Sequence, residues 1–250
     1  MRSALRVMKA VQSSTFLASS QFSQLQRIAG VERPAPSMIN GAGMGLFAAR
    51  PADAGEVISL YPVHGIGRDN HFADGQAAFL AADEHGDYFD TSEVPAYRQY
   101  LLGERSLLFL PASSSAPIFI DCNPNAPLVP GWRGSLVNDG AACTGGSEAE
   151  VVRYYVESKR TKNCALVPFG PAPLMAYVTT RRVEEGEEFS TTYGADFWLA
   201  GAPLELTPSI NLLVRELATC LHTTAQAVAA SYAPDLRILT ALFERSSKRR

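Results

Sequence analysis

The stretch Gly41-Ala42-Gly43-Met44-Gly45-Leu46-Phe47-Ala48-Ala49-Arg50-Pro51 decides which fold the sequence can adopt. Alternating glycines occur in phosphate-binding loops, and also in plain turns that need a positive φ. A dinucleotide-binding loop requires a strand before the glycines and a long helix after them. Here Pro34 and Pro36 precede the glycines, and Pro51 ends any helix within two turns of them. The context therefore argues against every Rossmann-type fold.

Short strands and tight turns surround the glycines and recur near the other end of the chain. Leu46-Phe47-Ala48-Ala49 is a brief apolar run, and Asp53-Ala54-Gly55-Glu56 predicts a turn before a strand over 57–61. Much further along, Glu184-Glu185-Gly186-Glu187 predicts a second turn, which leads into the segment from Phe189 to Tyr193. The two ends of this region therefore share a turn-then-strand pattern.

Together, these two segments resemble the opening and closing motifs of the SET domain. In that family Gly-x-Gly-Leu-Phe-Ala precedes a turn, a Gly-Glu pair and a strand ending in Tyr, as from Gly43 to Tyr61 here. The closing motif places Gly-Glu-Glu before a strand and a Tyr-Gly pair, matched by Gly186-Glu187-Glu188 and Tyr193-Gly194. The resemblance covers about residues 38–198. It implies methyl transfer from S-adenosylmethionine to a protein lysine, with Tyr193 as the catalytic tyrosine.

The central motif of the family matches only in part. The family shows Arg-Phe-x-Asn-His-x-Cys after an Ile-Asp strand, and this chain has Ile120-Asp121 followed by Gly134-Ser135-Leu136-Val137-Asn138-Asp139-Gly140-Ala141. Asn138 fits, whereas Asp139 stands in place of the histidine and Ser135 in place of the arginine. Taken alone, Asn-Asp-Gly is also a common turn sequence. The flanking matches, in the right order, favour the motif over the turn.

The resemblance also implies which residues bind the cofactor. The backbone of Gly43, Met44 and Gly45 would line the S-adenosylmethionine pocket, and the missing side chains of the glycines would leave room for it. Asn138 would contact the amino acid portion of the cofactor, and Asp139 would contact the adenine through its backbone. Because a backbone contact survives a change of side chain, Asp139 does not by itself abolish binding. Tyr193 would also contact the cofactor.

Methyl transfer to lysine requires an amine that has lost its proton, and the ordinary pKa of lysine is about 10.4. A narrow apolar channel beside a cationic sulfonium lowers that pKa through desolvation and like charge. Tyr193 would orient the amine, and Tyr61, Phe197 and Trp198 are candidate channel walls, since aromatic faces suit a methylated ammonium. Simple packing in the core is an equally good interpretation of those three walls.

The expected fold is mainly β with short helices, an α+β arrangement of small curved sheets like the β-clip of the SET domain. We divide the chain into an N-terminal extension (1–35), a SET domain (36–198) with a variable insert (64–117), and a helical C-terminal extension (199–250). Local patterns predict a linker over 31–37, short helices over 72–82 and 95–102, strands over 107–110, 118–120, 151–157, 163–168 and 174–180, and helices over 207–221 and 224–246 with a break near Pro234.

Composition and charge limit the classes of function. The 250 residues are 46% hydrophobic and 19% charged, as in an ordinary globular protein. A formal net charge of -3 argues against direct nucleic acid binding through a basic surface, and a lysine-rich protein partner fits better. The acidic residues between 83 and 93 could attract such a partner, although a solvated loop is the common meaning of such a run. The four cysteines form no Cys-x-x-Cys pair, so we expect no metal site.

The N-terminus is basic, serine-rich and free of acidic residues before Glu32. Arg2, Arg6 and Lys9 share one face of a predicted helix whose other face carries apolar residues. This composition is typical of a mitochondrial or plastid presequence, and a packed or flexible helix fits it equally well. Without a presequence we expect an intracellular protein of the cytoplasm or nucleus. No stretch reaches the ~20 apolar residues that a membrane span needs.

Two further interpretations stay open on the sequence alone. One is a SET-like binding module that has lost catalysis, which Asp139 and the missing arginine suggest and which the retained Tyr193 opposes. The other is a structural scaffold that binds no cofactor.

Overall fold

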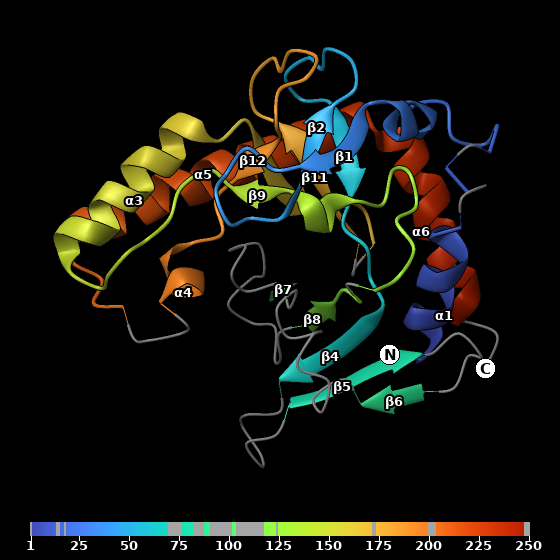
Figure 1. The fold of residues 1–250 in the computed structure, drawn as a ribbon. Helices are drawn as coiled ribbons and strands as arrows, with labels where there is room; N and C mark the ends of the chain where they lie inside the picture. Colours follow the sequence, from blue (N-terminus) through green and yellow to red (C-terminus); the bar gives the residue numbers. More distant parts are fainter. Residues whose placement is uncertain are drawn as a thin grey trace.

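The computed structural model describes residues 2–13, 16–17, 19–69, 77–82, 88–90, 102–103, 118–123, 125–171, 174–199 and 204–247. Small sheets occupy the middle of the molecule, and helices cover its flanks (Figure 1). This mixture of short antiparallel strands and helices confirms the expected α+β fold.

The core is built on a three-stranded sheet with the order β10-β11-β3. Its strands are β3 (Val57–Leu60), β10 (Cys164–Pro168) and β11 (Met175–Thr179). Nearly every residue of these strands is buried, which explains why they appear in the sequence as continuous apolar runs rather than as alternating patterns. The strands expected over 163–168 and 174–180 are confirmed, and so is the one over 57–61.

An antiparallel hairpin joins β1 (Glu32–Pro36) to β2 (Met44–Ala48), so the linker expected over 31–37 was wrong. The backbone N–H of Ser37 donates to the carbonyl of Gly43 at 2.8 Å. Residues with odd numbers in this stretch therefore turn their N–H groups toward β2, and the two prolines of β1 face the opposite side. Because proline lacks an N–H, an edge strand tolerates it only in this orientation.

The central and closing motifs meet in a short parallel pair. Strand β9 (Asn138–Asp139) follows a 3-10 turn, η4 (Gly134–Leu136), and it pairs with β12 (Ser190–Thr191). The register places Ser190 beside Asn138 and Thr191 beside Asp139. Two segments that lie far apart in the sequence thus run side by side in the middle of the fold (Figure 1).

A separate sheet has the order β6-β5-β4-β8-β7 and lies below the core in Figure 1. Its strands are β4 (Gly65–Asp69), β5 (Ala77–Ala82), β6 (Tyr88–Asp90), β7 (Leu102–Gly103) and β8 (Ile118–Asp121). The strand expected over 118–120 is confirmed. The described end of the helix expected over 72–82 is instead β5, where pairing with β4 overrides the helix preference of alanine. The strand expected over 107–110 lies outside the described residues, as does all but Leu102 of the helix expected over 95–102.

Helix α3 (Glu148–Thr161) replaces the strand expected over 151–157. Ser147 caps it, accepting from the backbone of Glu150, whose side chain reaches back to the backbone of Ser147. The buried residues Val151, Tyr154, Tyr155 and Ser158 recur at helical spacing. This reciprocal cap and this spacing outweigh the strand preference of the valines and tyrosines.

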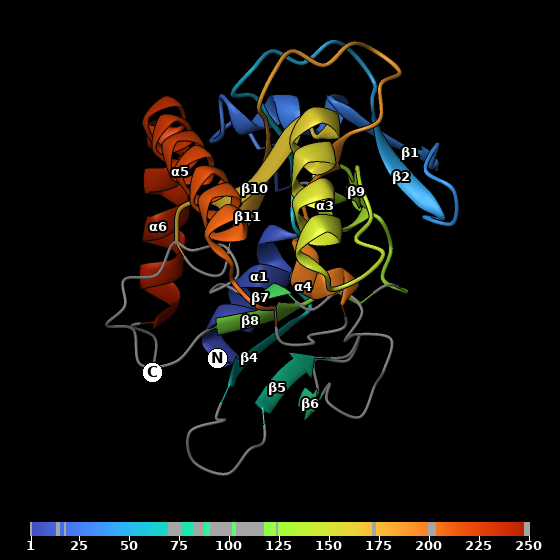
Figure 2. The same ribbon diagram turned by 90° about the vertical axis from the view of Figure 1, so that its left-hand side faces the viewer.

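The C-terminal extension is helical as expected, with boundaries that differ from the prediction. Helix α4 (Ala195–Trp198) lies at the end of the expected SET domain, and the extension holds α5 (Pro208–Ser231) and α6 (Ala233–Ser247). Pro234 lies in the first turn of α6, where a missing N–H costs nothing, so it opens the second helix instead of breaking it. Figure 2 shows α5 beside β10 and α3, which it contacts.

The N-terminal helix α1 (Arg2–Val11) packs into the fold against α6 (Figure 1). Leu5, Met8 and Val11 are buried, whereas Arg6 and Lys9 are exposed, so the two faces expected from the sequence are confirmed. The 3-10 helix η1 (Leu25–Gly30) follows. The presequence stays a prediction. No described helix combines the length and apolar character that crossing a bilayer would require.

Candidate active site

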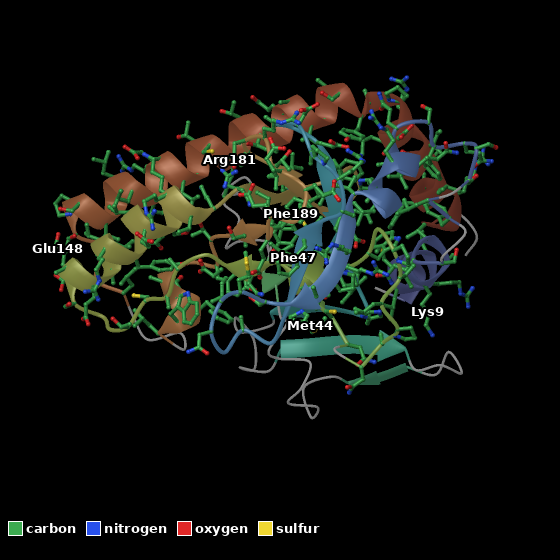
Figure 3. The ribbon with its side chains drawn as sticks, turned by 45° about the horizontal axis from the view of Figure 1, so that its top comes forward. Lys9, Met44, Phe47, Glu148, Arg181 and Phe189 are labelled. Carbon is green, nitrogen blue, oxygen red and sulfur yellow. The ribbon has the colours of Figure 1, made fainter. Side chains whose placement is uncertain are left out.

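The candidate site forms where β2 meets the β9–β12 pair. The Asn138 side-chain amide donates to the carbonyl of Met44 at 3.1 Å, and the Phe189 N–H donates to the carbonyl of Leu46 at 2.7 Å. Figure 3 shows Met44 and Phe47 on β2, with Phe189 nearby. The opening, central and closing motifs therefore come together in one place, as the sequence predicted.

Gly43, directly before β2, and Gly45, within β2, are required for different reasons. Gly43 has a φ of +72° and open space around its missing side chain, so its backbone conformation favours glycine. A Cβ on Gly45 would instead lie 2.3 Å from Oε1 of Glu188. The sequence suggested that both glycines leave room for a cofactor. In the structure, the room at Gly45 is filled by a carboxylate of the protein.

Glu188 is a site residue that the sequence reasoning did not single out. Its buried carboxylate accepts from the Ser37 hydroxyl at 2.6 Å, the Met38 N–H at 2.8 Å and the Asn138 amide at 3.2 Å. It thereby ties the β1–β2 turn to the central motif. Its place in the Gly-Glu-Glu sequence was the only signal for it.

Asn138 uses both hydrogens of its amide within the protein, on Met44 and on Glu188. Its Oδ1 oxygen accepts no hydrogen bond from the part of the chain that the structure describes. Asn138 is half-buried, beside an exposed Met44. An acceptor at this position suits an ammonium or hydroxyl group of a ligand.

The side chain of Asp139 turns into the protein. Its carboxylate accepts from Tyr154 Oη, Tyr193 N and Trp198 Nε1 on Oδ2, and from Ala141 N on Oδ1. Burial raises the pKa of this carboxyl above its ordinary value, and the hydrogen bonds oppose that shift. Any contact of Asp139 with a cofactor must therefore use its backbone, as the resemblance implied.

Tyr193, Phe197 and Trp198 form one aromatic cluster. The rings of Tyr193 and Phe197 meet edge to face with centroids 4.7 Å apart, and those of Phe197 and Trp198 with centroids 5.4 Å apart. Their exposed fractions are 36%, 53% and 37%, respectively, so none is an ordinary core residue. The hydroxyl of Tyr193 donates to the carbonyl of Val137 at 2.8 Å.

Tyr61, the third predicted channel wall, is buried in the core beside Tyr177. A Cβ on Gly134 would lie 3.0 Å from the Tyr177 ring and 3.1 Å from the Cα of Tyr61, so the three residues pack closely. Burial raises the pKa of Tyr177, and nearby Tyr193 and Tyr61 add to the shift. Tyr177, which the sequence did not single out, therefore packs beside Tyr61 around Gly134.

Within the described residues, no group of His, Cys, Asp and Glu side chains is arranged to hold a metal ion. Cys122, Cys143, Cys164 and Cys220 are free thiols. Ser135 stands where the family has an arginine, but an arginine lies two residues earlier, at position 133. Arg133 forms an ion pair with the buried Glu32 at 2.9 Å and thereby holds η4 against β1.

The sequence profile of the SET domain matches residues 43–194. The chain belongs to the SET-domain family. Membership suggests protein methyltransferase activity in general, and methyltransferases of this family generally use S-adenosylmethionine. No curated protein matches the chain.

The residues present fit that cofactor. Asn138 offers an open acceptor beside the exposed Met44, and the exposed aromatic rings of the cluster suit a cationic sulfonium. At position 139 the aspartate side chain is buried, so its carboxylate does not face outward.

Proposed function

We propose that this protein transfers a methyl group from S-adenosylmethionine to the ε-amine of a lysine in a protein substrate. The observation that carries the proposal is the position of Tyr193, half exposed within an aromatic cluster and joined through β9 to Asn138 and the glycine segment. In this family the cofactor supplies the methyl group and its leaving group. The residues of the chain supply position and environment.

Tyr193 is suited to orient the amine. Its hydroxyl hydrogen is directed at the carbonyl of Val137, so its oxygen acts as an acceptor toward a substrate N–H. An amine held beside Phe197 and Trp198 loses part of its hydration. Desolvation disfavours the ammonium form, and so lowers the pKa of the lysine toward the range in which the neutral, nucleophilic amine is populated.

We further propose that the substrate presents its lysine in a basic segment, since the chain carries a formal net charge of -3. Among the residues expected to attract it, those between 83 and 93 lie outside the described chain apart from β6 (Tyr88–Asp90).

The first test is a calorimetric titration with S-adenosylmethionine, comparing the wild type with Asn138→Ala. Loss of one hydrogen-bonding side chain should weaken binding roughly three- to tenfold. Asn211→Ala is the matched control, because its amide also donates to a backbone carbonyl, that of Leu206, but on the exposed surface of α5. If the folded wild-type protein does not bind S-adenosylmethionine, the proposal is wrong and the interpretation as a structural scaffold replaces it.

A further inference from the structure

The turn that carries Tyr193 is held by side chains rather than by a sheet. Beyond β12, the N–H of Tyr193 donates to Asp139 at 3.0 Å, that of Gly194 to the Tyr154 hydroxyl at 2.9 Å, and that of Ala195 to the Tyr155 hydroxyl at 3.3 Å. Since buried backbone N–H groups need partners, these three side chains set the course of the chain after the strand.

One oxygen of Asp139 collects most of these contacts. Oδ2 accepts from Tyr193 N, from Trp198 Nε1 at 2.9 Å and from the Tyr154 hydroxyl, while Oδ1 accepts from Ala141 N. Hydrogen bonds inside a protein are stronger than the same bonds in water, so an oxygen that collects several donors fixes them firmly. A neutral histidine, the residue usual at this position in the family, has a single acceptor nitrogen and could not take all four donors.

Two of the residues that donate to Asp139, Tyr193 and Trp198, lie on the exposed face of the site. Tyr193 and Trp198 flank Phe197, and all three rings reach solvent. Exposed aromatic side chains ordinarily exchange rotamers quickly. Here the backbone N–H of Tyr193 and the indole N–H of Trp198 both donate to Oδ2 of the buried Asp139, which restricts both residues.

We propose that Asp139 is the positioning residue of this site, setting Tyr193 and Trp198 relative to one another through its Oδ2 atom. The role in catalysis rests on the proposed function, in which Tyr193 contacts the amine. On this account aspartate takes over the role of the histidine in holding the turn that carries Tyr193. Tyr154 and Trp198 donate hydrogen bonds to it. The aspartate is therefore compatible with catalytic activity.

The test compares wild type, Asp139→Asn and Asp139→Ala by iodide quenching of tryptophan fluorescence. Trp132 is buried, so iodide reaches chiefly Trp198. Asparagine keeps the shape and can still accept on one atom, but its NH2 group cannot accept the bond from Ala141. We expect the quenching constant to rise about twofold in Asp139→Asn as the indole loosens, and further in Asp139→Ala if that variant folds.

Asp235→Asn is the matched control. Asp235 is also buried and accepts two backbone N–H groups, those of Gln24 and Leu25, far from the aromatic cluster in sequence and contacts. Both asparagine variants should unfold at lower temperature, but only Asp139→Asn should change quenching. Unchanged quenching in Asp139→Asn, or an equal change in Asp235→Asn, would overturn the proposal.

Kinetics separate this role from a merely structural one. On a substrate found by labelled methyl transfer, Asp139→Asn should lower kcat about tenfold, as expected for a displaced catalytic group, and leave the affinity for S-adenosylmethionine nearly unchanged. Parallel losses in kcat and cofactor affinity would contradict it. Failure of the wild type to bind S-adenosylmethionine would remove the proposed function, whereas the quenching comparison would still decide whether Asp139 holds Trp198.

Discussion

The carboxylate of Glu188 lies directly against Gly45, so close that a Cβ on the glycine would come within 2.3 Å of Oε1 and 2.9 Å of Cδ. The contact joins the first motif of the domain to the last. Because Glu188 also holds Ser37, Met38 and Asn138, a displacement of its side chain would spread to the turn before β2 and to the central motif.

Gly45→Ala should therefore be destabilising by roughly 1–3 kcal/mol, the usual cost of overpacking, and should weaken cofactor binding through Asn138. Gly43→Asn is the matched control, since position 43 has open space and asparagine tolerates a positive φ. Urea unfolding of both variants measures the difference. Equal stability of Gly45→Ala and wild type would show that Glu188 moves aside without cost.

Tyr154→Phe removes a hydroxyl that donates to Asp139 and accepts from the N–H of Gly194. Loss of the bond to Asp139, together with a half-buried N–H left without an acceptor, should cost about 1–3 kcal/mol. Tyr155→Phe is the matched comparison, because it also leaves a backbone N–H, that of Ala195, without its acceptor at 3.3 Å, whereas the Tyr155 hydroxyl does not touch Asp139. A larger loss of stability in Tyr154→Phe therefore measures the contact with Asp139.

The same variant should change the dependence of stability on pH. Burial raises the pKa of Asp139, so the folded state holds this proton to higher pH than the unfolded chain, and stability is lost as the pH rises through the folded pKa. The bond from Tyr154 opposes the shift, so its loss should extend that decline to higher pH in Tyr154→Phe. Denaturant titrations at a series of pH values above the ordinary pKa of 3.8 would show it. Parallel curves for Tyr154→Phe and Tyr155→Phe would contradict the assignment.

His64 should make the fold sensitive to acid. Burial, aided by the charge of Lys9, lowers the pKa of His64 from 6.5 to about 4, and its Nδ1 accepts from the N–H of Asn123 at 2.9 Å. The unfolded chain therefore binds a proton in this window while the folded protein does not, and stability falls as the pH drops below 6.5. Near pH 5 the loss should be about 2 kcal/mol.

His64→Gln should remove most of that loss, because glutamine does not titrate. His222→Gln, on the exposed surface of α5, should leave it in place. Unfolding free energies measured between neutral pH and about pH 5 test the pair. An unaltered acid dependence in His64→Gln would assign the effect to other groups.

Motifs with fixed spacing made the fold predictable, and with it the meeting of the opening, central and closing motifs in one place. Glycines, the Gly-Glu-Glu sequence and Tyr193-Gly194 each satisfy a local backbone requirement, and such requirements can be read along the chain. Gly194, for example, adopts φ 99° and ψ 152°, a conformation essentially restricted to glycine.

Features that depend on distant partners were missed. Asp139 Oδ2 accepts hydrogen bonds from Tyr154, Tyr193 and Trp198. These residues lie far from Asp139 in the sequence, so no local pattern predicts the contacts. Strand β1 was taken for a linker because the orientation of its prolines is set by pairing with β2. Helix α3 was missed although Ser147 and Glu150 carried the signal, since a run of valine and tyrosine outweighed it.

The central claim is methyl transfer, and the most direct measurement is incorporation of label from methyl-labelled S-adenosylmethionine into a broad panel of lysine-containing proteins. The account predicts label on lysine with the wild type, loss of label with Tyr193→Phe, and a much smaller change in the cofactor affinity of that variant. Saturable binding of cofactor by the wild type without transfer to any protein of the panel would contradict it, and would favour a SET-like binding module.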